Sequence, residues 1–222
     1  MIRRGNVARW RQVRRRQQGQ GLVEFALFVP LFLVLLLAML DFGFALYTNL
    51  TLEYASREGA RVGAALAAGN STTLPCANVD DHVIAAVQRV LQSAGLTVPL
   101  TNNGDASKST VNWIRIYKAT NYTDGSGYNV ANNYNEWDYS ATGPWDTVDG
   151  TALKFVVGTH NWDACSRTNG TTPDKIGVAI SYTYAWQTPI ASAFRLISHG
   201  ASFFTNLTIL DKTVMDLNPT YP

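Results

Sequence analysis

The chain has 222 residues, a formal net charge of +2 and 15% charged residues, so it can hold one compact domain with an anchor or two small domains. The charge is uneven, because seven arginines precede Gly19 with no acid among them, which leaves a net charge of −5 on the rest. A mildly acidic body with a short basic leader is not the pattern of a nucleic-acid-binding domain, and we expect no nucleic-acid partner.

An apolar run from Leu22 to Leu40 follows the leader. As a helix it would be about 28 Å long, close to the roughly 30 Å of a bilayer's hydrocarbon core. A cleavable secretory signal has a shorter apolar region and a small-residue site at its end, which this run lacks. Because arginines beside a span favour the cytoplasmic side, we expect a basic cytoplasmic leader (1–19), a transmembrane helix (20–40) and an extracytoplasmic domain (41–222).

Two residues interrupt the apolar run. Pro30 removes one backbone hydrogen bond and is expected to bend or soften the helix. Glu24 is the only acid, and an ionised carboxylate in hydrocarbon costs at least a few kcal/mol. Glu24 therefore needs a partner or a function.

The helical pattern continues from Asp41 to Ala67 without a proline, which predicts one continuous helix. Two apolar stripes run along it. One contains Phe44, Thr51, Ala55, Gly59, Val62 and Leu66, and the other contains Phe42, Leu46, Leu50 and Tyr54. The small residues Ala55, Gly59 and Gly63 allow close approach, so this side is expected to face the chain's own sheet. The second stripe is left for a neighbouring subunit, for lipid or for the headgroup zone.

The rest of the chain predicts an α+β domain. A polar turn over Gly69–Pro75 should end the long helix, Asp80 or Asp81 should cap a second, short helix, and Gly95 should close that helix. Period-two patterns predict strands over Val111–Tyr117, Leu153–Val157, Ile176–Trp186 and Phe203–Met215, mainly antiparallel, with a short amphipathic helix over Pro189–Ile197.

The segment Thr120–Gly150 is polar, aromatic and poor in aliphatic residues, which predicts a loop. Its aromatic side chains suit stacking on sugars or on a partner, and equally suit a self-packed loop. Its aspartates offer oxygen ligands for Ca²⁺ but lack the spacing of an EF-hand loop. The residues concerned are Tyr122, Tyr128, Tyr134, Trp137, Tyr139 and Trp145, with Asp124, Asp138, Asp146 and Asp149.

Cys76 and Cys165 would lie in an oxidising compartment, where a disulfide between them is expected and two free thiols are the alternative. The three histidines, His82, His160 and His199, form no metal-ligand or catalytic signature. P-loop, G-x-G-x-x-G and G-x-S-x-G motifs are missing from the sequence. We therefore expect no metal, no cofactor and no enzymatic activity.

The amino-terminal pattern resembles the type IV pilin and pseudopilin superfamily, and within it the TadE-like proteins of the tight-adherence (Tad) pilus. The similarity rests on the stretches GQGLVEFALFVPLFLVLLL from Gly19, LDFG from Leu40 and ASREGARVG from Ala55, with a helix-then-strand ending around Pro189–Met215.

This resemblance implies cleavage by prepilin peptidase between Gly19 and Gln20, on the cytoplasmic side. Glu24 then becomes the fifth mature residue, and the new α-amine of Gln20 in an adjacent subunit can neutralise it during assembly. Related pilins commonly begin with an N-methylated phenylalanine, where this chain has Gln20. The implied protein is a minor pilin or pseudopilin for surface adhesion. Its partners would be prepilin peptidase, other pilin subunits and a cytoplasmic assembly ATPase.

Two hypotheses of other classes compete with this interpretation. An unprocessed, single-pass, membrane-anchored binding domain has no need of Glu24 and predicts that Glu24→Ala leaves function intact. A secreted carbohydrate-active enzyme predicts loss of activity when acids in Thr120–Gly150 are changed.

Overall fold

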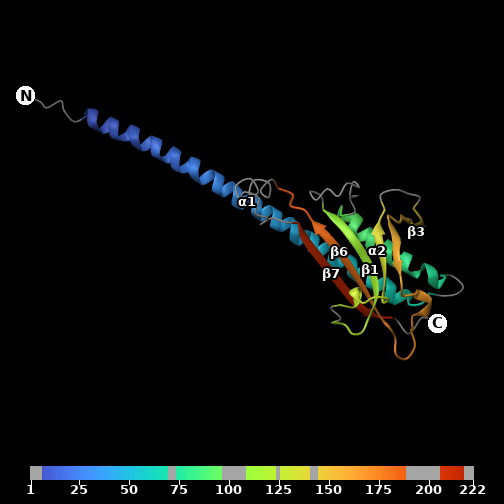
Figure 1. Cartoon of the computed structure of the whole chain (residues 1–222). Helices are drawn as coiled ribbons and strands as arrows, with labels where there is room; N and C mark the ends of the chain where they lie inside the picture. Colours follow the sequence, from blue (N-terminus) through green and yellow to red (C-terminus); the bar gives the residue numbers. More distant parts are fainter. Residues whose placement is uncertain are drawn as a thin grey trace, which may run out of the picture. The chain divides into compact units, whose positions relative to one another are not determined.

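The structure is a computed structural model (Figure 1), which describes residues 7–69, 74–96, 109–123, 126–140, 145–188 and 206–217. In the first segment it describes side chains from Gln20 onward. The chain forms two units, Met1–Gly43 with Gln187–Phe203, and Phe44–Trp186 with Phe204–Pro222. The short helix predicted over Pro189–Ile197 lies outside the described residues.

One helix, α1, runs from Val7 to Leu66 and includes Pro30. The continuous helix predicted beyond Asp41 is therefore confirmed. Just after Leu66, the backbone turns left-handed, with φ of 49° at Ala67 and 77° at Gly69. The helix thus ends just before the turn predicted from Gly69, where a glycine adopts the left-handed conformation without strain.

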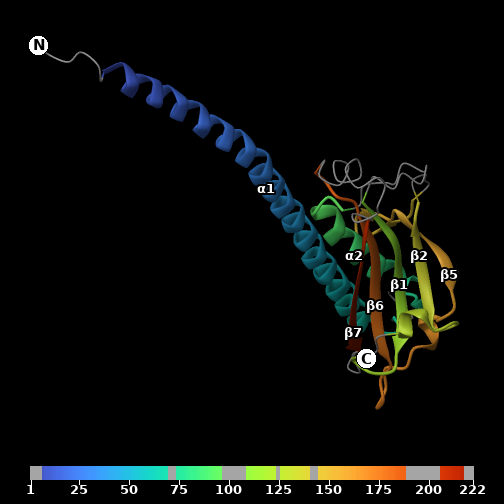
Figure 2. The ribbon, with the colours of Figure 1, turned by 60° about the vertical axis from the view of Figure 1, so that its left-hand side comes forward.

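The second unit contains a five-stranded sheet in the order β5-β2-β1-β6-β7, with every neighbouring pair antiparallel (Figure 2). Its strands are β1 (Thr110–Ala119), β2 (Tyr134–Tyr139), β5 (Phe155–His160), β6 (Lys175–Tyr184) and β7 (Leu207–Asp216). A separate two-stranded hairpin is formed by β3 (Thr147–Val148) and β4 (Thr151–Ala152). The α+β class with a mainly antiparallel sheet is confirmed.

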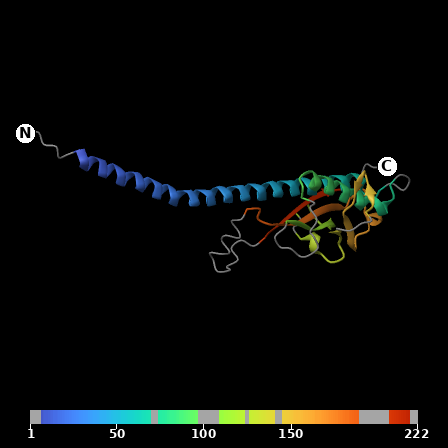
Figure 3. The same cartoon turned by 90° about the horizontal axis from the view of Figure 1, so that it is seen from above.

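The carboxyl-terminal part of α1 and the short helix α2 (Val79–Ser93) cover one face of this sheet (Figure 3). Fully buried side chains from α1, α2, β1 and β6 make the core between them: Leu52, Ala55, Val83, Ile84, Val87, Leu91, Ile114, Ile116, Ile176, Val178 and Ile180. The packing is close at two glycines of α1. A Cβ on Gly59 would lie 2.5 Å from a methyl of Val87, and one on Gly63 would lie 2.5 Å from Ile176 Cδ1. The prediction that small residues on α1 let the sheet pack closely against the helix is confirmed.

Part of the predicted stripe on α1 is wrong. Phe44 was expected to face the sheet, but half of its surface is exposed. The buried arc includes Leu52 and Gly59. Phe44 therefore lies outside the buried arc.

The prediction of a loop over Thr120–Gly150 is also wrong in part. The segment contains β2, which pairs with both β1 and β5, and a 3-10 turn, η2 (Gly127–Asn129). Trp137 of β2 is only 1% exposed and belongs to the core. This segment forms a strand because it pairs with β1 and β5, although its polar sequence does not indicate one.

Two smaller corrections concern element ends. Asn78, not Asp80 or Asp81, occupies the N-cap position of α2, and both aspartates lie in its first turn. The strand predicted over Leu153–Val157 is found as β5, shifted toward its carboxyl end. Gly95 closes α2 as expected, with φ of 71° and a hydrogen bond from Leu96 N to Leu91 O.

Candidate functional site

The residues singled out at the amino terminus all lie on α1. Gly19 is helical, and the helix continues without interruption through Gln20 to Glu24. Because positions four apart are neighbours on a helix, Gln20 and Glu24 share one face. The Gln20 Nε2 amide donates a hydrogen bond of 3.1 Å to Glu24 Oε1. The structure thus brings two of the three predicted residues into contact and supplies Glu24 with a neutral donor from its own chain.

The surroundings of this pair are apolar and exposed. Leu22, Val23 and Phe25 each leave about two thirds of their surface uncovered. The helix from Gln20 onward is long and apolar enough to serve as a single-pass membrane anchor. Such a surface is stable where lipid tails or other apolar helices cover it.

Beyond the apolar run, the second stripe of α1 is also exposed. Its members Phe42, Leu46, Leu50 and Tyr54 are 48% to 64% exposed. Two ion pairs lie near its carboxyl end, Arg57 with Glu53 and Arg61 with Glu58. Exposed helix pairs of this kind add little to stability. The second stripe is therefore an exposed apolar surface with charged side chains near its carboxyl end.

Asp41, which directly follows the apolar run, has a role that the sequence did not indicate. Its carboxylate is 3% exposed and accepts hydrogen bonds from the backbone amides of Gln187 and Thr188, both at 3.1 Å, and from the Thr188 hydroxyl. A carboxylate that accepts several hydrogen bonds at once is well compensated for its burial. Asp41 thus ties the chain after β6 to α1.

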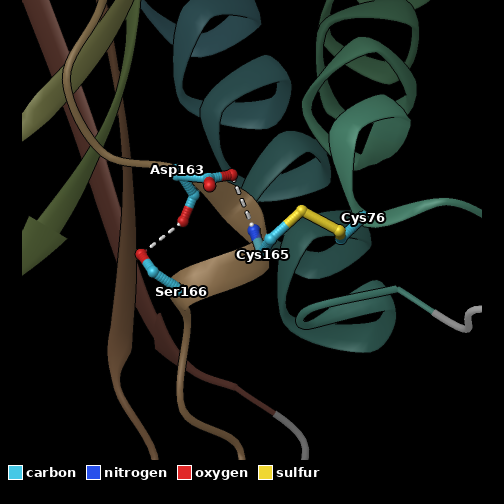
Figure 4. Close-up of a disulfide and its surroundings, with 4 residues drawn as sticks. All are labelled: Cys76, Asp163, Cys165 and Ser166. Atoms are coloured by element: carbon cyan, nitrogen blue, oxygen red, sulfur yellow. Dashed lines mark hydrogen bonds between the residues drawn. A yellow bond between two sulfur atoms is a disulfide. The ribbon is translucent and has the colours of Figure 1, made fainter.

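The two cysteines are joined in a disulfide, as expected from the sequence (Figure 4). Cys76 belongs to the turn η1 (Cys76–Asn78) before α2, and Cys165 belongs to η3 (Ala164–Ser166) after β5. Asp163 caps η3, because its Oδ1 accepts from Cys165 N at 2.9 Å and its carbonyl accepts from Ser166 Oγ at 2.7 Å. The bond links segments 89 residues apart.

A buried ion pair near the disulfide was missed by sequence reasoning. Arg167 Nη1 lies 2.7 Å from Asp80 Oδ1, its Nη2 donates to Asp80 Oδ2 at 2.8 Å, and both residues are at most 4% exposed. The ring of Trp162 lies 4.2 Å from the guanidinium carbon. The fully buried Asn135 completes this network with bonds to Asp80 and to the backbone of Trp162. The network secures α2 to β2 and to the chain after η3.

The aromatic residues of Thr120–Gly150 do not form one surface. Trp137 is in the core, and the Tyr134 ring packs on the guanidinium of Arg115, 4.3 Å from its carbon. Tyr122 stays 62% exposed and its hydroxyl donates to Asp216. The self-packed alternative therefore describes most of this segment.

No metal site emerges among the residues that the structure describes, where no group of three or more His, Cys, Asp or Glu side chains could hold an ion. His82 Nδ1 instead lies 2.8 Å from Asp149 Oδ2, which links α2 to the turn between β3 and β4. Asp124 and His199 lie outside the described residues.

In a comparison with known protein families, residues 19–61 match a family described as TadE-like protein. The match begins at Gly19, includes Gln20 and Glu24 and follows α1 to Arg61. Comparison with curated proteins and with solved structures gives no match. The amino-terminal segment, residues 19–61, is thus TadE-like.

Proposed function

We propose that this protein is a minor pilin or pseudopilin of a Tad-type pilus, with a structural and not a catalytic role. The observation that carries the proposal is the TadE-like match, which starts at the residue before the proposed cleavage site. Prepilin peptidase cuts between Gly19 and Gln20, and the mature chain takes part in pilus assembly and surface adhesion.

Topology supports cleavage on the cytoplasmic side. The arginines of the leader precede the apolar run, which favours a cytoplasmic amino terminus and an extracytoplasmic domain over 41–222. The disulfide between Cys76 and Cys165 agrees with an oxidising compartment for that domain.

Glu24 links processing to assembly. Within one chain it receives one neutral hydrogen bond from Gln20, which leaves its charge uncompensated. Cleavage creates an α-amine, and the amine of an adjacent subunit supplies the missing positive charge. Because a charge in hydrocarbon costs a few kcal/mol, this pairing favours the register in which amine and carboxylate meet.

The second stripe of α1 extends the same contact outside the membrane. Its exposed apolar side chains, on the face opposite the sheet, suit packing against another subunit. The proposed partners are other pilin subunits, prepilin peptidase and the cytoplasmic assembly ATPase.

Intact-mass analysis of the protein from its own host tests the processing step. We expect a chain that begins at Gln20, and a chain that begins at Met1 when the peptidase is deleted. Gly19→Leu should block cleavage, whereas Gly21→Leu is the matched control, because a Cβ at Gly21 meets no other atom within 4 Å. A wild-type chain that retains Met1 would instead support the unprocessed membrane-anchored binding domain.

A further inference from the structure

The proposed cleavage would leave a glutamine at the amino terminus, and such a glutamine can close a ring on itself. Its α-nitrogen attacks the side-chain carbon Cδ, the bond between Cδ and Nε2 breaks, and ammonia leaves with a proton from the amine. The product is a neutral five-membered lactam, pyroglutamate. This reaction needs no oxidant and no second substrate. Cyclisation would remove the α-amine of Gln20, which is the group proposed to pair with Glu24 of a neighbouring subunit.

The contact between Gln20 and Glu24 opposes this reaction. With Nε2 bonded to Glu24 Oε1 at 3.1 Å, the carboxamide extends one helical turn toward the carboxyl end. Ring closure requires Cδ to fold back onto the α-nitrogen of the same residue. One side chain cannot adopt both conformations, and the nitrogen that would leave is the one held by Glu24.

The sequence around the pair makes Glu24 the sole candidate for this role. Positions 21–23 and 25–40 carry no charged side chain. The pair is flanked by the apolar side chains of Leu22, Val23 and Phe25. In a low-dielectric environment without competing water, a hydrogen bond to a carboxylate is stronger than in solution.

We propose that Glu24 protects the mature terminus from cyclisation by holding the Gln20 carboxamide away from the α-nitrogen. Glu24 is thus a positioning residue that keeps the amine free for assembly. This inference rests on the proposed cleavage after Gly19, and it assigns to Glu24 a task within its own chain.

The test uses the full mature chain with the leader replaced by a tag whose protease leaves Gln20 as the first residue, reconstituted in lipid discs. Intact mass then follows the loss of ammonia at neutral pH. Glu24→Ala should cyclise about twofold to tenfold faster than the wild type, the effect of one lost hydrogen bond. Glu24→Gln keeps an acceptor oxygen without the charge, so it should cyclise at a rate between those of the wild type and Glu24→Ala. Gln20→Ala cannot cyclise and provides the baseline.

Equal rates for the wild type and Glu24→Ala would overturn the inference, as would a Glu24→Gln chain that cyclises as fast as Glu24→Ala. Removing an acid from an apolar span favours insertion, so Glu24→Ala should stay in the bilayer. Because the tag supplies the terminus, this result is independent of cleavage in the host. If the chain retains Met1 in its host, the proposed function is refuted, but the inference about Glu24 is not.

Discussion

The close packing of α1 on the sheet at Gly59 makes a sharp prediction for Gly59→Leu. The glycine leaves no space, because a Cβ would lie 2.5 Å from a methyl of Val87, which is a clash, and would already be in ordinary contact with Val178 at 3.4 Å. Both valines are fully buried and cannot move into solvent. The four carbons of leucine must therefore separate the helix from α2 and β6.

The expected cost follows from two opposing effects. Overpacking a core costs about 1 to 3 kcal/mol, and four added carbons place this substitution at the upper end. Leucine gains about 0.8 kcal/mol over glycine in helix propensity. The net loss is about 2 kcal/mol, which for a domain of this size lowers the melting temperature by about 4 to 8 °C. Gly59→Ala gains a similar helix propensity and inserts one carbon, so its loss should be smaller.

Thermal unfolding of the full chain in detergent, followed by the fluorescence of the buried Trp137 and Trp162, measures this loss. Ala65→Leu is the matched control, because Ala65 is exposed on the same helix and the change costs only about 0.2 kcal/mol of helix propensity. If Gly59→Leu and Ala65→Leu melt at the same temperature, α1 does not pack on the sheet through Gly59.

Three further predictions concern the domain's polar and covalent contacts. Removing the disulfide by Cys76→Ser with Cys165→Ser should cost about 2 to 5 kcal/mol, seen as a lower urea midpoint, and an unchanged midpoint would contradict a stabilising bond. Asp80→Asn leaves Arg167 buried without its charge partner and should cost about 3 to 5 kcal/mol of unfolding free energy. Adding Arg167→Met to this variant should recover part of that loss. If the losses of the two single variants simply add in the double variant, the ion pair does not contribute as proposed. Burial raises the pKa of Asp211, with repulsion from Glu53 adding to it and the Ser56 hydroxyl opposing it. Because the folded state then binds the proton more tightly, the wild type should lose stability relative to Asp211→Asn as pH rises from below the ordinary carboxyl pKa through the raised one. A wild type that gains stability relative to Asp211→Asn over this range would contradict this.

The long helix and its sheet-facing glycines could be predicted because their signals are local. The helical pattern is uninterrupted, which predicts the long helix. Its small residues indicate the side that comes close to another element, namely Ala55, Gly59 and Gly63. The aromatic Phe44 shows the limit of this reasoning. Helical spacing gives the direction of a side chain but not the width of the buried arc, which the packed partners determine.

The strand β2 could not be predicted because its inward positions are not all apolar. Asn135 is fully buried, yet its polar side chain is satisfied by Asp80 and by the backbone of Trp162. These partners come from distant parts of the chain, so the alternation typical of a strand is absent from the local sequence. The ion pair between Asp80 and Arg167 could not be predicted for the same reason, because the two residues are far apart in the sequence.

The shared helix face of Gln20 and Glu24 could be predicted for the opposite reason. Gly19, Gln20 and Glu24 lie within two helical turns, and their meaning depends on spacing along one helix. What the sequence did not indicate is that the Gln20 side chain itself bonds to Glu24. That contact depends on a side-chain conformation, which spacing alone does not determine.

The central proposal is that cleavage after Gly19 releases this chain for assembly, and the surface filament fraction tests it most directly. Filaments sheared from the host should contain the chain with Gln20 as its first residue, together with the other pilin subunits. The Gly19→Leu chain should stay in the membrane fraction, while the Gly21→Leu chain should reach the filament. A chain that begins at Met1 in the sheared filaments, or a Gly19→Leu chain that assembles normally, would contradict the account.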